Sequence, residues 1–374
     1  MPLKLSHTAA MIALILMACQ SPQSVADEAP PLTQHDDRYR TVEEQLPGWI
    51  EAYDLGSISV TLIENEEIAW TQIVGEQDDG VPANEETLYG VASLTKPIMA
   101  QVIMRLASEG QLDLDEPMRS YYTDTNLITD ERRKILTPRM LLQHQGGFPN
   151  WRSSQDGVLK INFDPGTDVQ YSGEGFDYLV RFLERKFKKR FEVLAQEYVF
   201  DPIGMKSSSL VYQPWFEGRR ANRKLEDGTW RDYWSPTRPS GANDLSTTTE
   251  DYARFVIAAM KNEGLSEEII REKQTITIDE VSKYCVSEDE TPLDFACPDK
   301  MGFGLSWYLY QYGDHQLFTH TGSNWGEKSM AIYSPDRKSG LVIAINGNNG
   351  YSFLFEIASM LYDNPDFIAF ARPD

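Results

Sequence analysis

The stretch Leu88-Tyr-Gly-Val-Ala-Ser93-Leu-Thr-Lys96-Pro-Ile-Met-Ala100 places a hydroxyl and an amine three residues apart, where an apolar pattern of helical period begins. Because Pro97 is tolerated in a helix only within the first turn, the helix is expected to begin close to Ser93 and to run to about Ser108. Spacing of i, i+3 then puts Lys96 on the same face as the Ser93 hydroxyl, at the positive end of the helix dipole. The pattern predicts Ser93 as a nucleophile. The alternative is a helix-capping serine beside a solvated lysine.

A second motif, Tyr171-Ser-Gly173, follows the turn-like Asp164-Pro-Gly166 and precedes a helical pattern. A phenol on this loop could relay a proton if Lys96 or other cations lower the pKa of Tyr171. The alternative is a packed tyrosine whose hydroxyl is satisfied by a neighbour.

A third motif, His320-Thr321-Gly322-Ser323, ends one strand pattern and precedes another. A glycine there would let a substrate lie along the strand without steric conflict. The backbone N–H groups of Ser323 and Ser93 could then form an oxyanion hole. Taken alone, the segment is equally compatible with a hairpin rich in turn residues.

In this order, the three motifs resemble those of the β-lactamase-related serine hydrolases, a family of class C β-lactamases, D-alanyl-D-alanine carboxypeptidases, D-aminopeptidases and related esterases. The resemblance implies that Ser93 is acylated and that Lys96 and Tyr171 share the acid and base work. It also implies that His320 and Thr321 bind substrate or stabilise charge, and it implies no cofactor. Further phrases that carry the resemblance, which spans roughly residues 56–347, are Leu141-Leu-Gln-His144-Gln-Gly-Gly-Phe-Pro149, Pro202-Ile-Gly-Met205 and Gly241-Ala-Asn-Asp-Leu-Ser-Thr247. His144 is expected to be a structural hydrogen-bonding residue.

Two residues depart from the family pattern. Gly173 stands where many members have an asparagine that contacts the substrate amide, and His320 stands where class C β-lactamases have a lysine that helps to hold the substrate carboxylate. A neutral imidazole grips a carboxylate less well than an ammonium near pH 7. Both departures weaken the β-lactamase interpretation and favour ester or peptide hydrolysis.

The order of elements predicts the architecture. Strand patterns occur near both ends of the chain and enclose a helix-rich middle, which predicts an antiparallel sheet built from both ends and flanked by helices. The expected fold class is therefore α/β (α+β), similar to the β-lactamase/penicillin-binding-protein fold, with one hydrolase domain over 46–374 and an all-α lobe inserted at about 98–245. The expected strands are Gly56–Ile63, Ile68–Val74, Phe303–Leu309, Gln316–His320, Ser329–Tyr333 and Leu341–Asn346, and the expected helices after Ser108 are Phe176–Tyr198, Glu250–Asn262, Ser352–Tyr362 and two that start near Leu112–Pro117 and Thr137–Leu142.

The amino terminus has the pattern of an export signal. Lys4 is followed by an uncharged apolar stretch that is short for a membrane span, and Leu16-Met-Ala-Cys19 resembles a bacterial lipobox. We expect a lipoprotein-type signal peptide at 1–18, lipidation of Cys19 and a flexible tether over 19–45. A membrane partner through this anchor and a location on the periplasmic side of the cell envelope, at the outer membrane, follow from this interpretation. The alternative is an ordinary secretory signal with an incidental cysteine.

The remaining cysteines, Cys285 and Cys297, lie twelve residues apart in a polar segment. In an oxidising compartment they are expected to form a disulfide, and the alternative is two free thiols. No histidine lies near them, so a metal site is not expected.

The charge of the chain excludes some partners. A formal net charge of −22 disfavours binding to nucleic acid, which requires clustered cations to neutralise phosphates. The chain has no Gly-x-Ser-x-Gly elbow and no His-Glu-x-x-His motif, which disfavours an α/β-hydrolase and a metalloprotease.

The sequence thus predicts a serine hydrolase that acts through a Ser93 acyl-enzyme on a small acyl ester or a D-amino-acid peptide. One alternative is a class C-like β-lactamase. The other is a catalytically degenerate penicillin-binding-like protein that binds cell-wall peptides or a partner.

Overall fold

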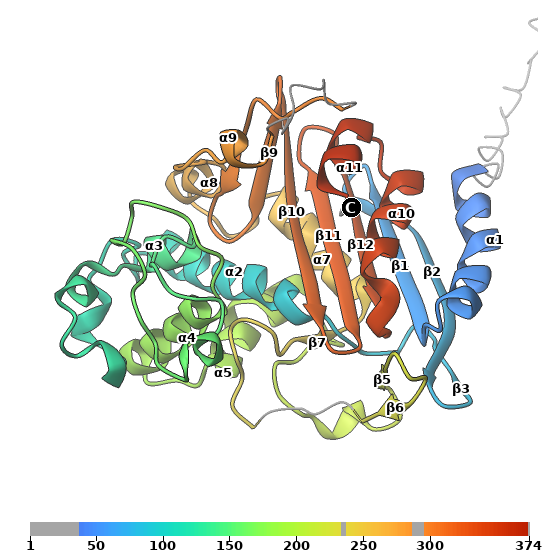
Figure 1. Ribbon diagram of the computed structural model, residues 1–374, viewed down its shortest axis with the longest axis horizontal. Helices are drawn as coiled ribbons and strands as arrows, with labels where there is room; N and C mark the ends of the chain where they lie inside the picture. The colour runs from blue at the N-terminus through green and yellow to red at the C-terminus, as the bar shows by residue number, and fades with distance from the viewer. Residues whose placement is uncertain (1–36, 233–236, 286–294, 373–374) are drawn as a thin grey trace, which may run out of the picture. The chain divides into compact units, whose positions relative to one another are not determined.

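The structure, a computed structural model, describes residues 37–232, 237–285 and 295–372 (Figure 1). Its main feature is an eight-stranded antiparallel sheet in the order β3-β2-β1-β12-β11-β10-β9-β8, so the first and last strands of the chain meet at its centre. This arrangement confirms the predicted fold class. The strands of the sheet are β1 Ser57–Glu64, β2 Glu67–Asp78, β3 Val81–Pro82, β8 Lys300–Phe303, β9 Tyr308–Tyr312, β10 His315–Asn324, β11 Glu327–Ser334 and β12 Ser339–Ile345, and short pairs are formed by β4 Tyr89–Gly90 with β7 Ser246–Thr247 and by β5 Arg223–Lys224 with β6 Trp230–Arg231.

Helices cover both faces of this sheet. Most of the helices that do not cover it lie between residues 95 and 203. The helices are α1 Asp37–Ala52, α2 Thr95–Ser108, α3 Pro138–Leu142, α4 Gly173–Phe187, α5 Phe191–Ala195, α6 Asp201–Ile203, α7 Thr249–Met260, α8 Glu267–Lys273, α9 Val281–Tyr284, α10 Tyr351–Leu361 and α11 Pro365–Ala371. In Figure 1, α1, α10 and α11 lie over one face, and α7 lies behind the sheet.

The alternation of side chains along β1 explains these layers. Ile58, Val60 and Leu62 belong to the buried cluster that includes residues of α1 and α10. Ser59 and Thr61 point the other way and hydrogen-bond to the Thr249 hydroxyl on α7, at 2.7 and 2.9 Å. Because strand side chains alternate between faces, one strand can join both helical layers to the sheet.

The amino-terminal boundary differs from the prediction. The leader 1–18, Cys19 and tether residues up to 36 lie outside the described residues, so export and lipidation stay predictions. Residues 37–45, which we expected in the tether, instead belong to α1. The physical reason is that Val42 and Leu46 share one helix face and are fully buried against the sheet. Among the described residues, no helix is long and apolar enough to span a membrane.

Three predicted elements are wrong in extent or type. The expected helix Phe176–Tyr198 ends at Phe187, because Lys188 adopts a left-handed conformation (φ 54°) and α5 then packs in a new direction. The segment Leu112–Pro117 forms no helix, and only a short 3-10 turn follows it at Met118–Ser120. The expected strand Phe303–Leu309 is not continuous: Phe303 ends β8, residues 304–307 form the connection, and β9 begins at Tyr308 and pairs with β8.

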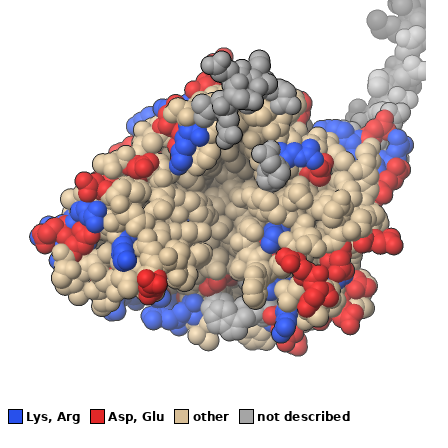
Figure 2. All heavy atoms as spheres, in the orientation of Figure 1, with Lys and Arg blue, Asp and Glu red and all other residues tan. Residues whose placement is uncertain are grey.

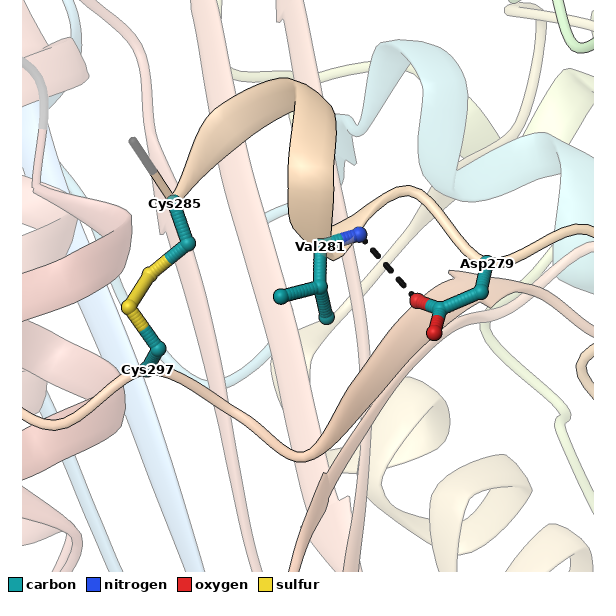
Figure 3. The surroundings of a disulfide bond; sticks show 4 residues. All are labelled: Asp279, Val281, Cys285 and Cys297. Atoms are coloured by element: carbon teal, nitrogen blue, oxygen red, sulfur yellow. Dashed lines mark hydrogen bonds between the residues drawn. A yellow bond between two sulfur atoms is a disulfide. The ribbon is translucent and has the colours of Figure 1, made fainter. Parts of the chain in front are cut away.

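A disulfide joins Cys285 at the end of α9 to Cys297, which precedes β8 (Figure 3). The start of α9 is held to the same strand by Asp279, whose carboxylate accepts hydrogen bonds from the backbone N–H groups of Val281 and Met301, both at 3.1 Å. The disulfide therefore closes a short loop whose two ends are anchored to the sheet.

Closing this loop is expected to stabilise the fold by restricting the unfolded chain. The twelve-residue separation gives about 3 kcal/mol in the chain-entropy model. The double variant Cys285→Ser/Cys297→Ser should therefore lose about 3 kcal/mol in the free energy of unfolding, measured by urea titration. Reductant should lower the stability of the wild type by a similar amount and leave the double variant unchanged. Equal stabilities of the two proteins without reductant would contradict this account.

Candidate functional site

Ser93 lies in a tight turn immediately before α2. The turn is the 3-10 segment η1, Ala92–Leu94, and Ala92 adopts a left-handed conformation with φ 44°. Such a conformation costs a non-glycine residue of order 1–3 kcal/mol and is often found at functional sites. The turn leaves Ser93 partly exposed while the residues on either side of it are buried.

Lys96 is fully buried beneath Ser93. Its Nζ donates to Ser93 Oγ at 3.0 Å and to the backbone carbonyl of Ala242 at 3.1 Å. The same nitrogen lies 4.7 Å from the centre of the Tyr171 ring and 5.6 Å from that of Phe176. The predicted i, i+3 geometry is therefore present, and the amine points inward to the hydroxyl instead of into solvent.

The surroundings of Lys96 change its basicity. Burial lowers the pKa of the Lys96 amine to about 7, and the carboxylate of Asp177 partly opposes this shift. Asp177 Oδ1 accepts hydrogen bonds from Ser240 Oγ at 2.5 Å and from the Gly241 N–H at 3.2 Å. Ser240 Oγ in turn accepts from the N–H of Ala242 at 3.0 Å. Asp177 thus both supplies charge and orders the loop whose carbonyl holds Lys96.

Tyr171 meets Ser93 as the motif analysis anticipated, but its ionisation differs from the expectation. Burial raises the pKa of the Tyr171 phenol, and a hydrogen bond with the Ser93 side chain opposes this only partly. The proton relay was made conditional on cations that lower this pKa, whereas desolvation of the phenolate raises it. The phenol therefore stays protonated at neutral pH, which suits a proton donor and not a resident base.

His144 supports the Tyr171 loop. Its Nδ1 accepts a hydrogen bond from the backbone N–H of Ser172 at 3.0 Å, and its ring lies 4.5 Å from that of Tyr171. Burial places the pKa of His144 well below its usual value. The residue has the structural hydrogen-bonding role that we expected.

The His-Thr-Gly segment lies on β10 beside the nucleophile. β9 pairs with β10 only as far as Thr319, and the strand edge beyond this point approaches the Ser93 turn. A Cβ atom at Gly322 would lie 2.2 Å from the Val91 carbonyl oxygen and 3.2 Å from the Ser93 backbone nitrogen. Only glycine permits this approach of β10 to the Ser93 turn.

The hydrogen bond of His320 fixes its tautomer. Nδ1 lies 2.8 Å from the carbonyl oxygen of Thr321, so Nδ1 carries the proton and Nε2 presents a lone pair. Nε2 is buried and has no hydrogen-bond partner among the described residues. Burial and the nearby Lys96 lower the pKa of His320 to about 3. His320 is thus a neutral acceptor and offers no charge to a carboxylate.

The glycine at position 173, where many family members have an asparagine, lies against the side chain of Trp151. A Cβ atom there would lie 2.6 Å from Cη2 of the Trp151 indole, and two further ring carbons would lie within 2.9 Å. The indole therefore fills the space that a family asparagine would need. Lys96 has the faces of two aromatic rings beside it and no side-chain amide among its described contacts.

A cleft of about 1090 Å³ adjoins these residues, and Tyr171, His320 and Thr321 are among the residues that line it. Figure 2 shows a hollow in this face of the molecule whose rim carries few charged side chains. Within the described residues, no group of three or more His, Cys, Asp or Glu side chains is arranged to hold a metal ion.

Sequence reasoning did not find Asp177, Ser240 or Trp151. Ala242 belongs to the Gly241–Thr247 phrase that carried the family resemblance. The resemblance pointed to this segment but did not predict that the Ala242 carbonyl accepts a hydrogen bond from Lys96. Asp177 lies on the α4 face that meets this loop, and only the folded chain brings its carboxylate near Lys96.

The sequence profile of the family described as Beta-lactamase matches residues 39–358. The match covers most of the chain, and the chain belongs to this family.

Individual relatives are distant. Esterase EstB of Burkholderia gladioli is 24% identical over 250 residues, which cover 53% of this chain and 64% of that protein. The chain spans 51–64% of the length of the first curated relatives that it matches. Among solved structures, D-alanine carboxypeptidase AmpC of Burkholderia cenocepacia superimposes with a TM-score of 0.70 at 18% identity, covering 87% of this chain and 98% of that one. An octameric penicillin-binding protein homologue of Pyrococcus abyssi gives a TM-score of 0.70 at 19% identity, covering 87% and 78%. These similarities establish the shared fold.

The contact between Gly173 and Trp151 predicts a pair of linked substitutions. Gly173→Ala should lower the free energy of unfolding by about 1–3 kcal/mol, because its Cβ would overlap the indole. The added cost should largely disappear when Trp151 is already alanine, as a double-mutant cycle would measure. Gly175→Ala is the matched control, because the Cβ there meets only ordinary contacts of 3.5 Å or more. Equal effects at the two glycines would contradict the steric explanation.

The pKa of Lys96 predicts how Ser93 reactivity depends on pH. The neutral amine, which can accept the Ser93 proton, predominates above pH 7 and the ammonium below it. The rate of Ser93 modification by a fluorophosphonate should therefore rise as pH increases through about 7.

Two variants identify the group that titrates. Asp177→Asn removes the charge that raises the pKa of Lys96, so the midpoint should move to lower pH. Asp244→Asn is the control, because burial raises the pKa of Asp244 to about 7 as well. The Asp244 carboxylate accepts a hydrogen bond from the Ser240 N–H. Because Asp177 also raises the pKa of Asp244, only Asp244→Asn separates the two groups: the transition should persist in this variant, and its loss would assign the transition to Asp244.

Proposed function

We propose that this protein is a serine hydrolase that forms an acyl-enzyme at Ser93 and cleaves uncharged esters or amides. The observation that carries the proposal is the fully buried Lys96 amine, 3.0 Å from Ser93 Oγ and with a pKa of about 7. A lysine in this state is a general base at neutral pH, which an ordinary surface lysine is not.

The geometry supports a definite sequence of proton transfers. Lys96 takes the proton of Ser93 as Oγ attacks the carbonyl carbon, and the backbone N–H groups of Ser93 and Ser323 stabilise the oxyanion. Tyr171, protonated and hydrogen-bonded to Ser93, donates to the leaving group and is reprotonated by Lys96. A water molecule then releases the acyl group, with the same residues in reversed roles.

Two features disfavour a β-lactamase, whose substrates carry a carboxylate. His320 is neutral and presents a lone pair, which repels a carboxylate. The Trp151 indole fills the place of the amide that contacts the substrate in many family members. The similarity to an esterase is compatible with an uncharged substrate, as is the small number of charges around the cleft.

Intact-mass spectrometry after fluorophosphonate treatment tests the nucleophile. Wild type should gain one adduct, and Ser93→Ala should gain none. Ser120→Ala is the control, because Ser120 is exposed and lies outside the three motifs, and it should gain the same adduct as wild type. Ser93→Ala should also lower ester hydrolysis by about a thousand-fold or more. Absence of an adduct on wild type would favour the catalytically degenerate binding protein. Rapid turnover of a cephalosporin would instead identify a β-lactamase.

A further inference from the structure

Aromatic side chains form one continuous wall from the reacting groups to the outer rim of the cleft. The ring of Tyr171 lies 6.2 Å from that of Phe303, which contacts Tyr308 at 4.7 Å. Tyr308 lies 5.1 Å from Tyr310, its neighbour on the same face of β9. Phe303 and Tyr310 are each less than a tenth exposed, so the strands hold this wall rigidly.

The wall continues onto the carboxy-terminal helix. Tyr310 contacts Phe367 at 5.0 Å and Phe370 at 5.8 Å, both on α11. Phe370 in turn meets Phe295, two residues before the disulfide cysteine Cys297, at 5.8 Å. Segments far apart in the sequence therefore supply one apolar surface. All these rings line the cleft that begins at Tyr171 and His320.

Each of the two cations that line the cleft, Lys283 and Arg372, is paired with a carboxylate. Lys283 Nζ donates to Glu280 at 3.2 Å, and Glu280 also accepts from the Tyr308 hydroxyl at 3.0 Å. Arg372 forms an ion pair with Glu356. The cations of the lining are thus already neutralised, which leaves the cleft suited to an uncharged, apolar group.

The position of Tyr171 decides which part of a substrate would enter. A group that protonates the leaving oxygen must face the leaving group, and Tyr171 both lies beside Ser93 and lines the cleft. An apolar extension of the leaving alcohol would therefore run outward along the aromatic wall.

We propose that the substrates are uncharged esters whose alcohol part is a long alkyl chain or a fused aromatic ring, bound in the cleft between Tyr171 and α11. This inference rests on the proposed hydrolase function. In the acylation step the bond from Ser93 Oγ to the acyl carbon forms and the carbon–alkoxy bond breaks. The proton leaves Ser93 for Lys96 and reaches the alcohol oxygen through Tyr171. The alcohol departs through the cleft, and water later releases the carboxylic acid.

The test compares two series of esters with the purified full chain, with acid release followed in a pH-stat. Acetate esters of ethanol, butanol, octanol and 2-naphthylmethanol vary the alcohol, and ethyl esters of acetic, butyric and octanoic acid vary the acyl group. We expect kcat/KM to increase about thirty-fold from ethyl to octyl acetate, with a much smaller change along the acyl series.

Variants of α11 locate the binding surface. Ala369 is exposed and lines the cleft, so Ala369→Trp should fill it and abolish most of the gain from the octyl chain. Phe370→Ala should reduce the same gain by removing part of the wall. Ile368→Ala is the matched control, because Ile368 is buried in the core on the same helix and does not line the cleft. Ile368→Ala should keep the gain from the octyl chain and hydrolyse ethyl acetate within two-fold of the wild-type rate.

The outcomes separate the two proposals. If ethyl acetate is hydrolysed in a Ser93-dependent manner but the rate is independent of the alcohol, or depends on acyl length instead, the inference about the cleft is wrong and the hydrolase function stands. A gain with alcohol length that Ala369→Trp and Phe370→Ala leave intact also overturns the inference. If no ester is hydrolysed, the proposed function fails, and the inference fails with it.

Discussion

The site depends on one buried contact, that of the Lys96 amine with the Ser93 hydroxyl. A lysine amine held away from water, between aromatic rings and a backbone carbonyl, loses much of the hydration that favours its charged form. The fold makes this burial possible by packing α2 against α5, α8 and the Gln196–Phe200 segment, with the rings of Tyr171 and Phe176 beside the amine and the Ala242 carbonyl bonded to it. Asp177 limits the loss of basicity, so the amine keeps a pKa near 7 instead of a much lower value.

Burial in these apolar surroundings shifts the pKa of each neighbouring group in favour of its uncharged form. It leaves much of Lys96 neutral near pH 7, so that the amine can accept a proton, keeps the Tyr171 phenol protonated and holds His144 and His320 neutral. One environment thereby sets an acceptor and a donor on either side of Ser93. The strand edge of β10, brought close by Gly322, adds backbone N–H groups without adding charge.

Local patterns in the sequence predicted the parts whose structure depends on neighbours along the chain. Pro97 and the apolar period placed the start of α2 within two residues, and the strand patterns at Gly56–Ile63, Ser329–Tyr333 and Leu341–Asn346 located the central strands. The break after Phe187 had no proline or glycine to mark it, because Lys188 takes the left-handed conformation that glycine usually adopts at this position. Contacts between distant segments were also beyond local reasoning. The Trp151 ring over Gly173 and the aromatic wall from β8 to α11 depend on how the chain is folded, and no spacing along the sequence encodes them.

The steric link between Gly173 and Trp151 constrains how this lineage and its asparagine-bearing relatives can interconvert through mutation. A single change of glycine to asparagine would pass through a form in which a new side chain overlaps an indole ring. A smaller residue must therefore replace Trp151 first, and only then can an asparagine be accommodated at position 173. The two positions are therefore epistatic, and the order of events, more than the number of substitutions, separates the two kinds of active site.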